Sequence, residues 1–414
     1  MKIELLTIGT ELLLGHLVDT NGAELGRALA DAGIAVVRRT SVPDEPTAIQ
    51  EAARLALERT GAFLATGGLG PTADDVTKKV VADLFGMPLD FHPEIWDALV
   101  ARFARFGRTP VEKNRSQAEV PRGATVLPNR WGTAPGLWLE GPPGLAILLP
   151  GVPGEMRALL QHEVLPRLAD RAENQVVRSR MIRTTGIPES TLAERIGPIE
   201  AELAPLTLAY LPRLEGVDLR LTAWGVAPAE ADDRLQAGLE RLRARAGPWA
   251  YGEDDTDLAA VVLARARERA LTLATAESCT GGVVGARLTE IPGSSEVFVG
   301  GVIAYDNRIK LEMLGVPAAL LEEHGAVSEP VARAMAEGAA RRFGTALSVA
   351  VTGIAGPSGG SADKPVGLVH LAAGHPGGIT TVRQVFPGSR AEIRGRAAQA
   401  ALFLLFRALT QDPT

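Results

Sequence analysis

The sequence LTLATA at residues 271–276 runs into Glu277-Ser278-Cys279-Thr280-Gly281-Gly282 and then into the helical pattern Val283–Thr289. This order predicts a buried strand, a tight loop and a helix. Small residues in such a loop let a ligand approach the backbone, and the first free N–H groups of a helix favour developing negative charge. Ser278 and Cys279 are therefore candidate nucleophiles, although a plain strand-to-helix turn has the same pattern.

The same alternation of strands and helices continues on both sides of this stretch. Thr256 is expected to cap a helix over Asp257–Ala270, and Ser328 a helix over Pro330–Phe343 that ends at Gly344. Further strands are expected at Val297–Tyr305, Ala346–Thr352 and Val366–Ala372. These elements predict a C-terminal α/β domain over residues 253–414.

The first part of the chain also alternates short apolar runs with helical patterns, which is typical of an α/β layer fold with a largely parallel sheet. The expected strands are Lys2–Ile8, Ile34–Thr40, Ala62–Ala65 and Gly144–Leu149, and the expected helices are Asn21–Ala32 and Pro46–Glu58. A loop at Pro150–Met156 opens a further helix. We expect this N-terminal domain to span residues 1–172.

Between these two lies a smaller unit, expected over residues 173–252, with the order βαββα. Its elements are Val177–Thr185, Ser190–Ala201, Leu206–Leu211, Val217–Trp224 and a long helix through Leu235 and Leu242. Gly252–Asp255 is interpreted as the linker that leaves it. The order is KH-like, but no Gly-x-x-Gly loop stands at the helix junction, so we expect a spacer or dimer contact and no RNA binding.

Composition narrows the class of protein. The net charge of −6 over 414 residues argues against a nucleic-acid-binding surface. A single cysteine, Cys279, excludes an intrachain disulfide and a thiolate zinc site. The N-terminus has no signal-peptide organisation, and no apolar run approaches the roughly 20 residues needed to span a bilayer. We therefore expect a cytoplasmic enzyme without membrane partners.

Ala304-Tyr305-Asp306-Asn307-Arg308-Ile309-Lys310 carries a possible base for the candidate nucleophile. A serine hydroxyl is a weak nucleophile until a base takes its proton, and a lysine whose pKa is lowered by burial is such a base. Most lysines are solvated surface residues, so spacing alone does not decide the role of Lys310. The thiol of Cys279 is the rival nucleophile, but none of these motifs holds a histidine to serve as its base.

Two glycine-rich loops could hold phosphate. One runs through Gly353–Gly360, with Lys364 and Arg390 as nearby candidate cations. The other is Thr66-Gly67-Gly68-Leu69-Gly70-Pro71-Thr72-Ala73-Asp74-Asp75-Val76-Thr77, which follows a strand and precedes a helix. Two carboxylates there would repel a bare phosphate, so a divalent cation is expected between them unless they serve only as helix caps.

The C-terminal motifs, taken in order, resemble the C-terminal domain of the CinA family (competence/damage-inducible protein A). They are Ala-Glu-Ser-Cys-Thr-Gly-Gly at 276–282, Gly-Ser-Ser at 293–295, Tyr305 with Lys310, Gly-Ala-Val-Ser-Glu-Pro at 325–330, Thr-Gly-Ile-Ala-Gly-Pro at 352–357 and Lys-Pro-Val-Gly at 364–367. The resemblance implies a nicotinamide-nucleotide amidase, which converts nicotinamide mononucleotide to nicotinate mononucleotide and ammonia.

That resemblance also implies roles for individual residues. Ser278 would be the nucleophile and Lys310 its general base, with Tyr305 assisting proton movement. The substrate would be bound by Thr280, Gly281, Gly282, Thr352, Gly353 and Arg390. Hydrolysis of an amide also needs an oxyanion site, which we expect at the N–H groups near Thr280–Gly282. No cofactor is expected in this domain.

The N-terminal motifs resemble the molybdopterin-binding (MoCF-like) domain of CinA proteins. They are Gly9–Gly15, Asp19-Thr20-Asn21, Val42–Glu45, the Gly67–Thr77 loop and Pro150–Met156. The resemblance implies hydrolysis of ADP-ribose to AMP and ribose 5-phosphate with a divalent ion (Mg, Mn or Co). Asp44 and Asp75 would be catalytic and, with Glu11 and Asp19, would hold the metal, while Thr10, Gly67, Gly68 and Gly70 would contact the substrate.

The sequence therefore predicts a bifunctional pyridine-nucleotide salvage enzyme, and we expect a homodimer. One alternative is a nucleotide- or pterin-binding scaffold linked to competence, without catalysis in one or both domains. For the N-terminal domain, the rival activity is molybdopterin adenylylation. The acidic net charge opposes direct DNA contact, and the presence of Ser278, Tyr305 and Lys310 opposes a degenerate C-terminal site.

Overall fold

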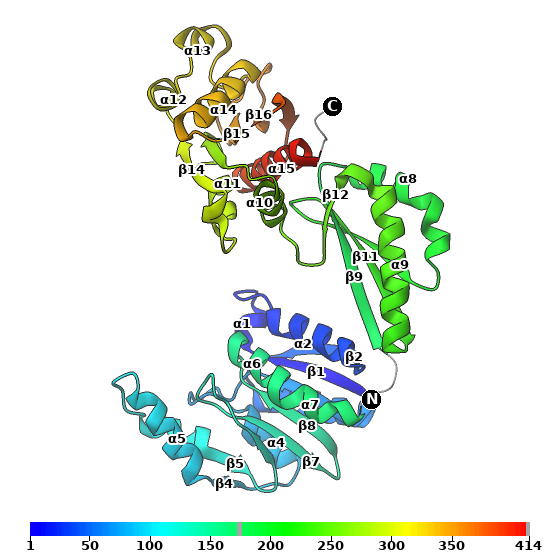
Figure 1. Cartoon of the computed structure of the whole chain (residues 1–414). Helices are drawn as coiled ribbons and strands as arrows, with labels where there is room; N and C mark the ends of the chain where they lie inside the picture. Colours follow the sequence, from blue (N-terminus) through cyan, green and yellow to red (C-terminus); the bar gives the residue numbers. More distant parts are fainter. Residues whose placement is uncertain (172–175, 411–414) are drawn as a thin grey trace. The chain divides into compact units, whose positions relative to one another are not determined.

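The computed structural model describes residues 1–171 and 176–410 (Figure 1). The chain forms two compact units, one of Met1–Arg178 with Ala223–Asp233 and the other of Ser179–Thr222 with Arg234–Thr414. The expected boundary between the first two domains, at 172–173, lies outside the described residues.

The first unit is built on a six-stranded sheet with the strand order β2-β1-β3-β8-β7-β6. The first four strands of that order are parallel, and the last two are antiparallel. In chain order the strands are β1 (Lys2–Ile8), β2 (Ala35–Val42), β3 (Ala62–Thr66), β6 (Thr125–Leu127), β7 (Gly136–Gly141) and β8 (Gly144–Leu149). The predicted α/β layer fold with a largely parallel sheet is confirmed.

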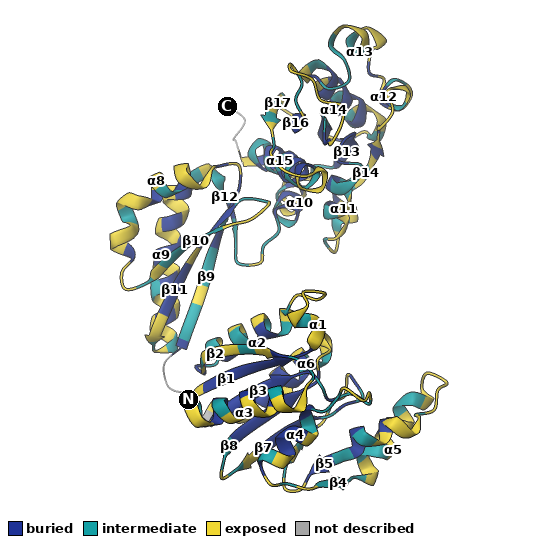
Figure 2. Cartoon of the chain, turned by 180° about the vertical axis from the view of Figure 1, so that it is seen from behind, coloured by how far each residue is buried: buried dark blue, intermediate teal, exposed yellow. Residues whose placement is uncertain are grey.

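Helices lie on both faces of this sheet, and the residues between the layers are buried (Figure 2). The helices are α1 (Thr10–Leu13), α2 (Thr20–Asp31), α3 (Pro46–Thr60), α4 (Thr77–Leu84), α5 (Pro93–Ala104), α6 (Pro153–Leu159) and α7 (Leu165–Leu168), with a strand pair β4 (Leu89–Phe91) and β5 (Glu119–Pro121). On one face, Leu25 and Leu29 of α2 pack with Ile3 and Leu5 of β1. On the other face, residues of α3 pack with Leu6 of β1. This arrangement follows from the alternation of side chains along β1.

The small middle domain has a four-stranded sheet with the order β10-β11-β9-β12. Its elements are β9 (Val176–Thr184), α8 (Glu189–Glu200), β10 (Thr207–Pro212), β11 (Val217–Val226), α9 (Pro228–Ala246) and β12 (Ala250–Glu253). The interpretation of Gly252–Asp255 as a linker is wrong at its first two residues, which pair with β9. Glu253 bonds Arg180 at 2.6 Å and Tyr251 is buried, but four residues are too few to give an alternating pattern.

The C-terminal domain is a five-stranded sheet with the order β14-β13-β15-β16-β17. β13 pairs in parallel with β14 and β15, and the last two strands are antiparallel. One face packs against α10, α11 and α15, and the other against α12 and α14. The elements are α10 (Leu258–Glu268), β13 (Leu273–Glu277), α11 (Val283–Thr289), β14 (Phe298–Ile303), α12 (Asn307–Leu314), α13 (Ala318–His324), α14 (Glu329–Phe343), β15 (Leu347–Gly353), β16 (Leu368–His375), β17 (Gly378–Val385) and α15 (Arg390–Thr410).

Two expected helix caps differ from the structure. Asp257, not Thr256, caps α10, since its carboxylate accepts a hydrogen bond from the Ala259 amide at 2.7 Å. Ser328 stands at the N-cap position of α14, but its hydroxyl donates to the Gly325 carbonyl at 2.8 Å. A serine hydroxyl bonds either neighbouring amides or carbonyls, whereas an aspartate carboxylate accepts from amides, so sequence alone does not fix which side chain caps the helix.

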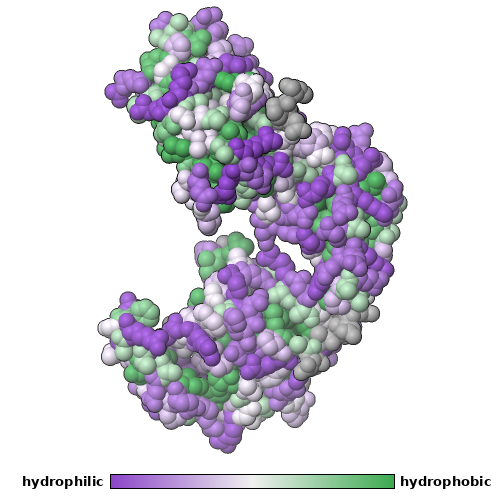
Figure 3. Space-filling view, in the orientation of Figure 1, coloured by the Kyte–Doolittle hydropathy of each residue, from purple (hydrophilic) through white to green (hydrophobic). Residues whose placement is uncertain are grey.

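Hydrophilic residues are spread over the visible face of both units, with hydrophobic residues in separate patches (Figure 3). Within the described ranges, no helix combines the length and apolarity that a bilayer crossing requires.

Candidate functional site

Three parallel strands of the C-terminal domain end side by side at the loop that carries Ser278. The Ser278 amide donates to the Val351 carbonyl of β15 at 2.8 Å. On the other side, the Ala304 amide, just past β14, donates to the Glu277 carbonyl at 2.7 Å. The loop is therefore fixed between the carboxyl ends of its two neighbours, where α/β sheets generally place their ligands. The predicted strand, loop and helix around Ser278 are confirmed.

Lys310 is buried, with 1% of its surface exposed, which is rare for an unpaired lysine. Its Nζ donates to the carbonyl oxygens of Ala304 at 2.8 Å and Tyr305 at 3.3 Å. Burial lowers the pKa of the amine, since desolvation disfavours its charged form. A neutral amine has two N–H groups and one lone pair, so the two carbonyls leave the lone pair available to accept a proton.

Sequence reasoning missed the role of Glu277, whose side chain is only 2% exposed. Its carboxylate accepts hydrogen bonds from the amides of Gly282 at 2.9 Å, Val284 at 3.1 Å and Gly285 at 2.8 Å. These are the first amides of α11, which otherwise have no acceptor within the helix. The usual helix cap is the residue directly before the helix, and Glu277 lies several residues earlier. The sequence therefore does not predict that its carboxylate caps α11.

This carboxylate corrects the expected oxyanion site. The Gly282 amide is taken by Glu277, and the Gly281 amide donates to the Ser278 carbonyl at 3.1 Å. In the part of the chain that the structure describes, no backbone or side-chain oxygen accepts from the amides of Cys279 and Thr280. Both amides, immediately after the candidate nucleophile, interact with the Cys279 sulfur, so an oxyanion there would take them over from the thiol.

Thr280 has a second unusual feature. Its hydroxyl is buried and, among the described residues, has no hydrogen-bond partner. Its carbonyl oxygen accepts from Arg394 of α15 through Nη2 at 2.7 Å and Nε at 3.2 Å. The arginine holds the peptide while the hydroxyl stays unsatisfied, a combination typical of a site that binds a polar group.

Cys279 lies in the same loop but is a poor candidate nucleophile. Burial, followed by smaller effects that include the charge of Glu277, raises the pKa of its thiol to about 12. Reactive cysteines have a lowered pKa, because the thiolate is the attacking form. Cys279 also interacts electrostatically with Lys310, so it lies close enough for a substitution there to affect the base.

The outer side of the site combines residues that the sequence suggested separately. Arg390 donates to the Tyr305 hydroxyl at 2.8 Å and to the Gly356 carbonyl at 2.7 Å. The Thr352 hydroxyl donates to the Ala326 carbonyl at 2.8 Å, so this donor is already used. A Cβ at Gly353 would lie 2.6 Å from the Leu368 carbonyl, so this glycine is required by the neighbouring strand. Lys364 bonds the His324 carbonyl at 2.7 Å.

In the N-terminal domain, the parallel strands β2, β1, β3 and β8 end at one edge of the sheet. Asp44, two residues beyond β2, accepts on Oδ2 from the Thr10 amide at 2.8 Å and the Thr10 hydroxyl at 3.1 Å. Asp75, in the loop after β3, accepts on Oδ2 from the Thr72 amide at 2.8 Å. Both carboxylates thus stand on loops of the same edge, with β1 between their strands.

The four expected metal ligands do not form one cluster. Across residues 1–171 and 176–410, no three His, Cys, Asp or Glu side chains are grouped to hold a metal ion. Asp19 caps α2 through the Gly22 amide at 2.8 Å and pairs with Arg39 at 3.0 Å, so it serves the fold. The Glu11 carboxylate folds back over Gly9, where a Cβ would lie 2.6 Å from Oε1.

The glycines of the Gly67–Thr77 loop are required by contacts within the protein. A Cβ at Gly67 would lie 2.1 Å from the Ile8 carbonyl, and one at Gly68 would lie 2.0 Å from the Thr77 hydroxyl. Both glycines also have positive φ values, of 111° and 67°. Close contacts and backbone conformation therefore already account for these glycines, without the expected approach of a ligand.

Three polar groups near this edge are wholly or largely buried, which the sequence did not predict. Asn21 Oδ1 and Thr77 Oγ1 are buried and have no partner among the described residues. Lys78, next to Thr77, is largely buried, and desolvation lowers its pKa to about 8. Unsatisfied polar atoms and a perturbed lysine at the end of parallel strands mark a candidate ligand site.

Comparison with known proteins places all three domains in one family. Three family models match: a "Probable molybdopterin binding domain" over residues 4–170, the "Damage-inducible protein CinA KH domain" over 179–252 and the "CinA C-terminal domain" over 255–409. A CinA-like protein of Gemmatimonas aurantiaca is 51% identical over 100% of this chain and 97% of its own length. The chain belongs to the CinA family.

Other CinA relatives align as completely. A CinA-like protein of Dictyoglomus turgidum is 40% identical over 99% of both chains. Among solved structures, the competence/damage inducible protein CihA from Agrobacterium tumefaciens is 46% identical over 37% of this chain and 94% of its own, with a TM-score of 0.36. The resemblance inferred from the motifs is thus confirmed for the family and its three-domain architecture.

Proposed function

We propose that the C-terminal domain of this CinA protein hydrolyses nicotinamide mononucleotide to nicotinate mononucleotide and ammonia, with Ser278 as nucleophile. The observation that carries the proposal is the buried amine of Lys310 at the Ala304 peptide. The amide of the same residue, Ala304, donates to the Glu277 carbonyl, directly before Ser278. We therefore assign Lys310, whose pKa is lowered, as the general base for Ser278.

In the first step, Ser278 Oγ attacks the carboxamide carbon while its proton passes to Lys310 Nζ. The carbonyl oxygen becomes an oxyanion, which the amides of Cys279 and Thr280 stabilise as hydrogen-bond donors in place of the Cys279 sulfur. The tetrahedral intermediate collapses, the C–N bond breaks, and Lys310 returns its proton to the leaving ammonia. The product is a nicotinoyl ester on Ser278.

In the second step, water attacks this ester and gives its proton to Lys310. The ester C–O bond breaks, and the proton returns to Ser278 Oγ as nicotinate mononucleotide leaves. Arg390 binds the substrate phosphate at the outer side of the site, and the Tyr305 hydroxyl accepts a hydrogen bond from Arg390 and holds it there. The reaction needs no cofactor.

The test is ammonia release from nicotinamide mononucleotide by the full chain in the presence of EDTA, with Ser278→Ala as the variant. We expect release by the unmodified protein and a loss of at least about a thousandfold in the variant, as for other activated nucleophiles. Release that persists in Ser278→Ala would contradict the serine mechanism. No release from either protein would favour the alternative of a binding domain linked to competence.

We infer a second activity for the N-terminal domain, metal-dependent hydrolysis of ADP-ribose to AMP and ribose 5-phosphate. The supporting observation is the sheet edge where Asp44 and Asp75 stand near the unsatisfied Asn21 and Thr77 side-chain oxygens. Asp44 and Asp75 would give a divalent ion such as Mg²⁺, Mn²⁺ or Co²⁺ two carboxylate ligands, and phosphate oxygens and water would supply the rest. A bound cation would lower the pKa of water and offset the charge of the pyrophosphate.

The residues of this chain have complementary roles in that reaction. Asp44 and Asp75 would hold the cation, while Thr10 keeps Asp44 in place through its amide and hydroxyl. Lys78, whose pKa is lowered to about 8, would place a cation beside the phosphates. A protein that binds a pterin but leaves ADP-ribose intact with each divalent ion would instead favour molybdopterin adenylylation.

A further inference from the structure

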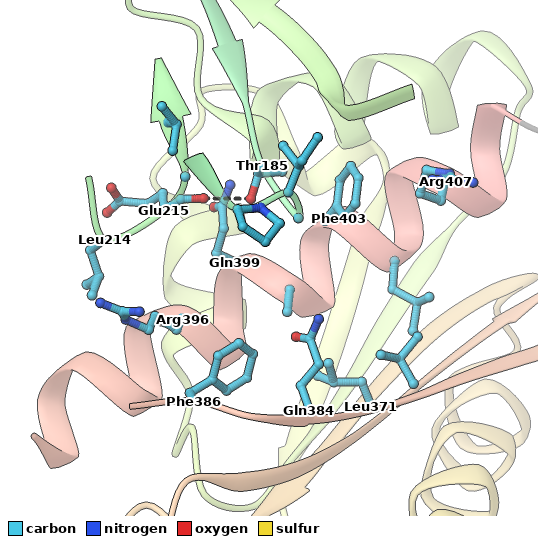
Figure 4. Close-up of a pocket in the computed structure, with 18 of the residues that line it drawn as sticks. Thr185, Leu214, Glu215, Leu371, Gln384, Phe386, Arg396, Gln399, Phe403 and Arg407 are labelled. Atoms are coloured by element: carbon cyan, nitrogen blue, oxygen red, sulfur yellow. Dashed lines mark hydrogen bonds between the residues drawn. The ribbon is translucent and has the colours of Figure 1, made fainter. Parts of the chain in front are cut away.

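A cavity of about 720 Å³ lies within the second unit, between the loops of the small domain and the β17–α15 side of the C-terminal domain (Figure 4). It is distinct from the Ser278 loop, since none of the residues 277–282 lines it. Its volume is within the range of small-molecule sites.

Two regular stripes of side chains form one side of the cavity. β17 contributes Val382 and Gln384, alternate residues that share one face of the strand, and Phe386 follows just past its end. α15 contributes Arg396, Gln399, Phe403 and Arg407, at spacings of three and four residues that share one face of the helix. The cavity is therefore built from the faces of two regular elements.

The loops of the small domain form the opposite side and are fixed by close contacts. A Cβ at Gly186 would lie 2.3 Å from the Phe403 ring, and one at Gly395 would lie 2.8 Å from the Leu214 side chain. The Thr185 hydroxyl donates to the Glu215 carbonyl at 2.6 Å, which ties the two loops together, as the dashed line in Figure 4 shows. These contacts define the cavity walls.

Three buried polar atoms in the lining have no hydrogen-bond partner among the residues that the structure describes. They are the acceptor Gln384 Oε1 and the donors Gln399 Nε2 and Arg396 Nε. Gln399 is only 3% exposed, and its other amide atom is fixed by Arg287 at 2.7 Å, so its free N–H groups are held in place. Leaving such groups unpaired is unfavourable, and a ligand that pairs with them relieves this cost.

The chemistry of the lining selects the class of ligand. Phe386, Phe403 and the aliphatic side chains beside them suit a flat, apolar ring. A free amide acceptor and a free amide donor match a carboxamide or nucleobase edge, which presents both kinds of group. Arg396 and Arg407 suit a phosphate, while Arg213 is already paired with Asp218 at 2.8 Å.

We propose that this cavity is a second, non-catalytic site that binds a mononucleotide, with its base between the two amides and its phosphate at Arg396. The site is joined to the Ser278 loop through α15, whose first turns supply Arg390 and Arg394. It is also joined through Gln399, which accepts from Arg287 of α11. The binding proposal does not depend on the deamidase proposal, because it concerns different residues.

The experiment is calorimetric titration of the full chain carrying Ser278→Ala, in EDTA, with AMP and separately with nicotinamide mononucleotide. The two probes share the mononucleotide chemistry and distinguish an adenine from a pyridine base. The second variant, Gln384→Leu, keeps the volume of the side chain but removes the free acceptor. Gln236→Leu is the matched control, since that amide is exposed on α9 and bonds Glu240.

We expect at least one mononucleotide to bind, with Kd weakened about tenfold or more by Gln384→Leu and unchanged by Gln236→Leu. Thermal melting of Gln384→Leu should match that of the parent, because the substitution removes only an unpaired group. Absence of binding by both probes at millimolar concentration would overturn the proposal. Nicotinamide mononucleotide is also expected at the Ser278 site, so the proposal is overturned if Gln384→Leu leaves every binding event unchanged for both probes.

Discussion

The Nη2 of Arg390 donates a hydrogen bond to the hydroxyl oxygen of Tyr305, 2.8 Å away, although 85 residues separate them in the chain. Tyr305 follows β14 and Arg390 begins α15, so the contact links two elements around the Ser278 loop. Tyr305 is 61% exposed and therefore stands at the solvent side of the site. This position suits recognition of the charged end of a substrate more than the chemistry at its amide.

We predict that Arg390→Ala raises KM for nicotinamide mononucleotide about ten- to a hundredfold, with a smaller change in kcat. The reason is the loss of a charge-assisted hydrogen bond to phosphate, which is worth about 1.5–3 kcal/mol. Ammonia-release kinetics measure both constants. Arg308→Ala, at an exposed arginine of α12, is the control.

A substrate without phosphate sharpens this prediction. Nicotinamide riboside cannot use Arg390 as a phosphate ligand, so its kcat/KM should be similar in the parent and in Arg390→Ala. An equal loss for both substrates would mean that Arg390 acts mainly by holding Tyr305 and the Gly356 loop, against the phosphate assignment.

The pH dependence of deamidation should follow Lys310. Burial lowers the pKa of its amine, so the folded protein loses this proton below the ordinary lysine pKa of 10.5. Only the neutral amine accepts a proton, hence kcat/KM should rise with pH through the lowered pKa and then level off. A pH–rate profile checks the direction and the midpoint.

The matched variant is Lys310→Arg, which keeps a positive charge that does not titrate in this range. We expect it to lack activity at every pH, with no rising limb. Activity that is flat with pH in the parent, or that falls where the amine becomes neutral, would contradict a role for Lys310 as the base.

Glu277 should support both the loop and the reaction. Glu277→Gln replaces one acceptor oxygen by an NH₂ group that opposes the amides of α11, and it removes a buried charge that accepts three hydrogen bonds. We expect a local destabilisation of about 2 kcal/mol and a fall in kcat of at least about tenfold. Faster hydrogen exchange at the amides of 282–285 would report the local change.

Glu290→Gln is the control, because this carboxylate is exposed at the other end of α11. If Glu277→Gln leaves both exchange and kcat at parental values, the carboxylate does not organise the loop. Slower turnover with unchanged exchange would instead assign Glu277 an electrostatic effect on the reacting groups.

Regular elements were predictable from sequence where apolar periodicity is strong. The bounds of Lys2–Ile8, Gly144–Leu149 and Val283–Thr289 agree with the structure because each combines a clear pattern with a turn residue at its end. β12 was missed since it has only four residues, with one buried side chain, Tyr251, and a glutamate, Glu253, that pairs with Arg180 of β9. Periodicity cannot report an edge strand this short.

The candidate site was predictable in its residue types but less so in its contacts. Nothing in the sequence connects Arg390 with Tyr305 or aims the Glu277 carboxylate at α11, because the order of strands in the sheet brings these groups together. For the same reason, the four carboxylates predicted to hold one metal ion do not form a single cluster. Asp19, for example, caps α2 because its carboxylate accepts a hydrogen bond from the Gly22 amide.

We predict that Cys279→Ala retains deamidase activity within about tenfold of the parent. The thiol, whose pKa is raised to about 12 by burial, is not ionised at neutral pH and is a weak nucleophile in that form. A modest loss is expected because the small cavity left by the sulfur lies beside Lys310. Full inactivation of this variant, together with residual activity of Ser278→Ala, would assign the nucleophile to the thiol.

The N-terminal proposal makes a separable prediction. Asp75→Asn and Asp44→Asn should each reduce ADP-ribose hydrolysis at least about a hundredfold, because an amide carries no charge to hold a divalent ion. AMP formation with added Mg²⁺, Mn²⁺ or Co²⁺ measures this activity, and ammonia release from nicotinamide mononucleotide should stay at the parental rate. Asp74→Asn is the control, as this exposed neighbour of Asp75 has no assigned ligand role. Equal losses in all three variants would point to disruption of the loop, and full activity in Asp75→Asn would remove that carboxylate from the metal site.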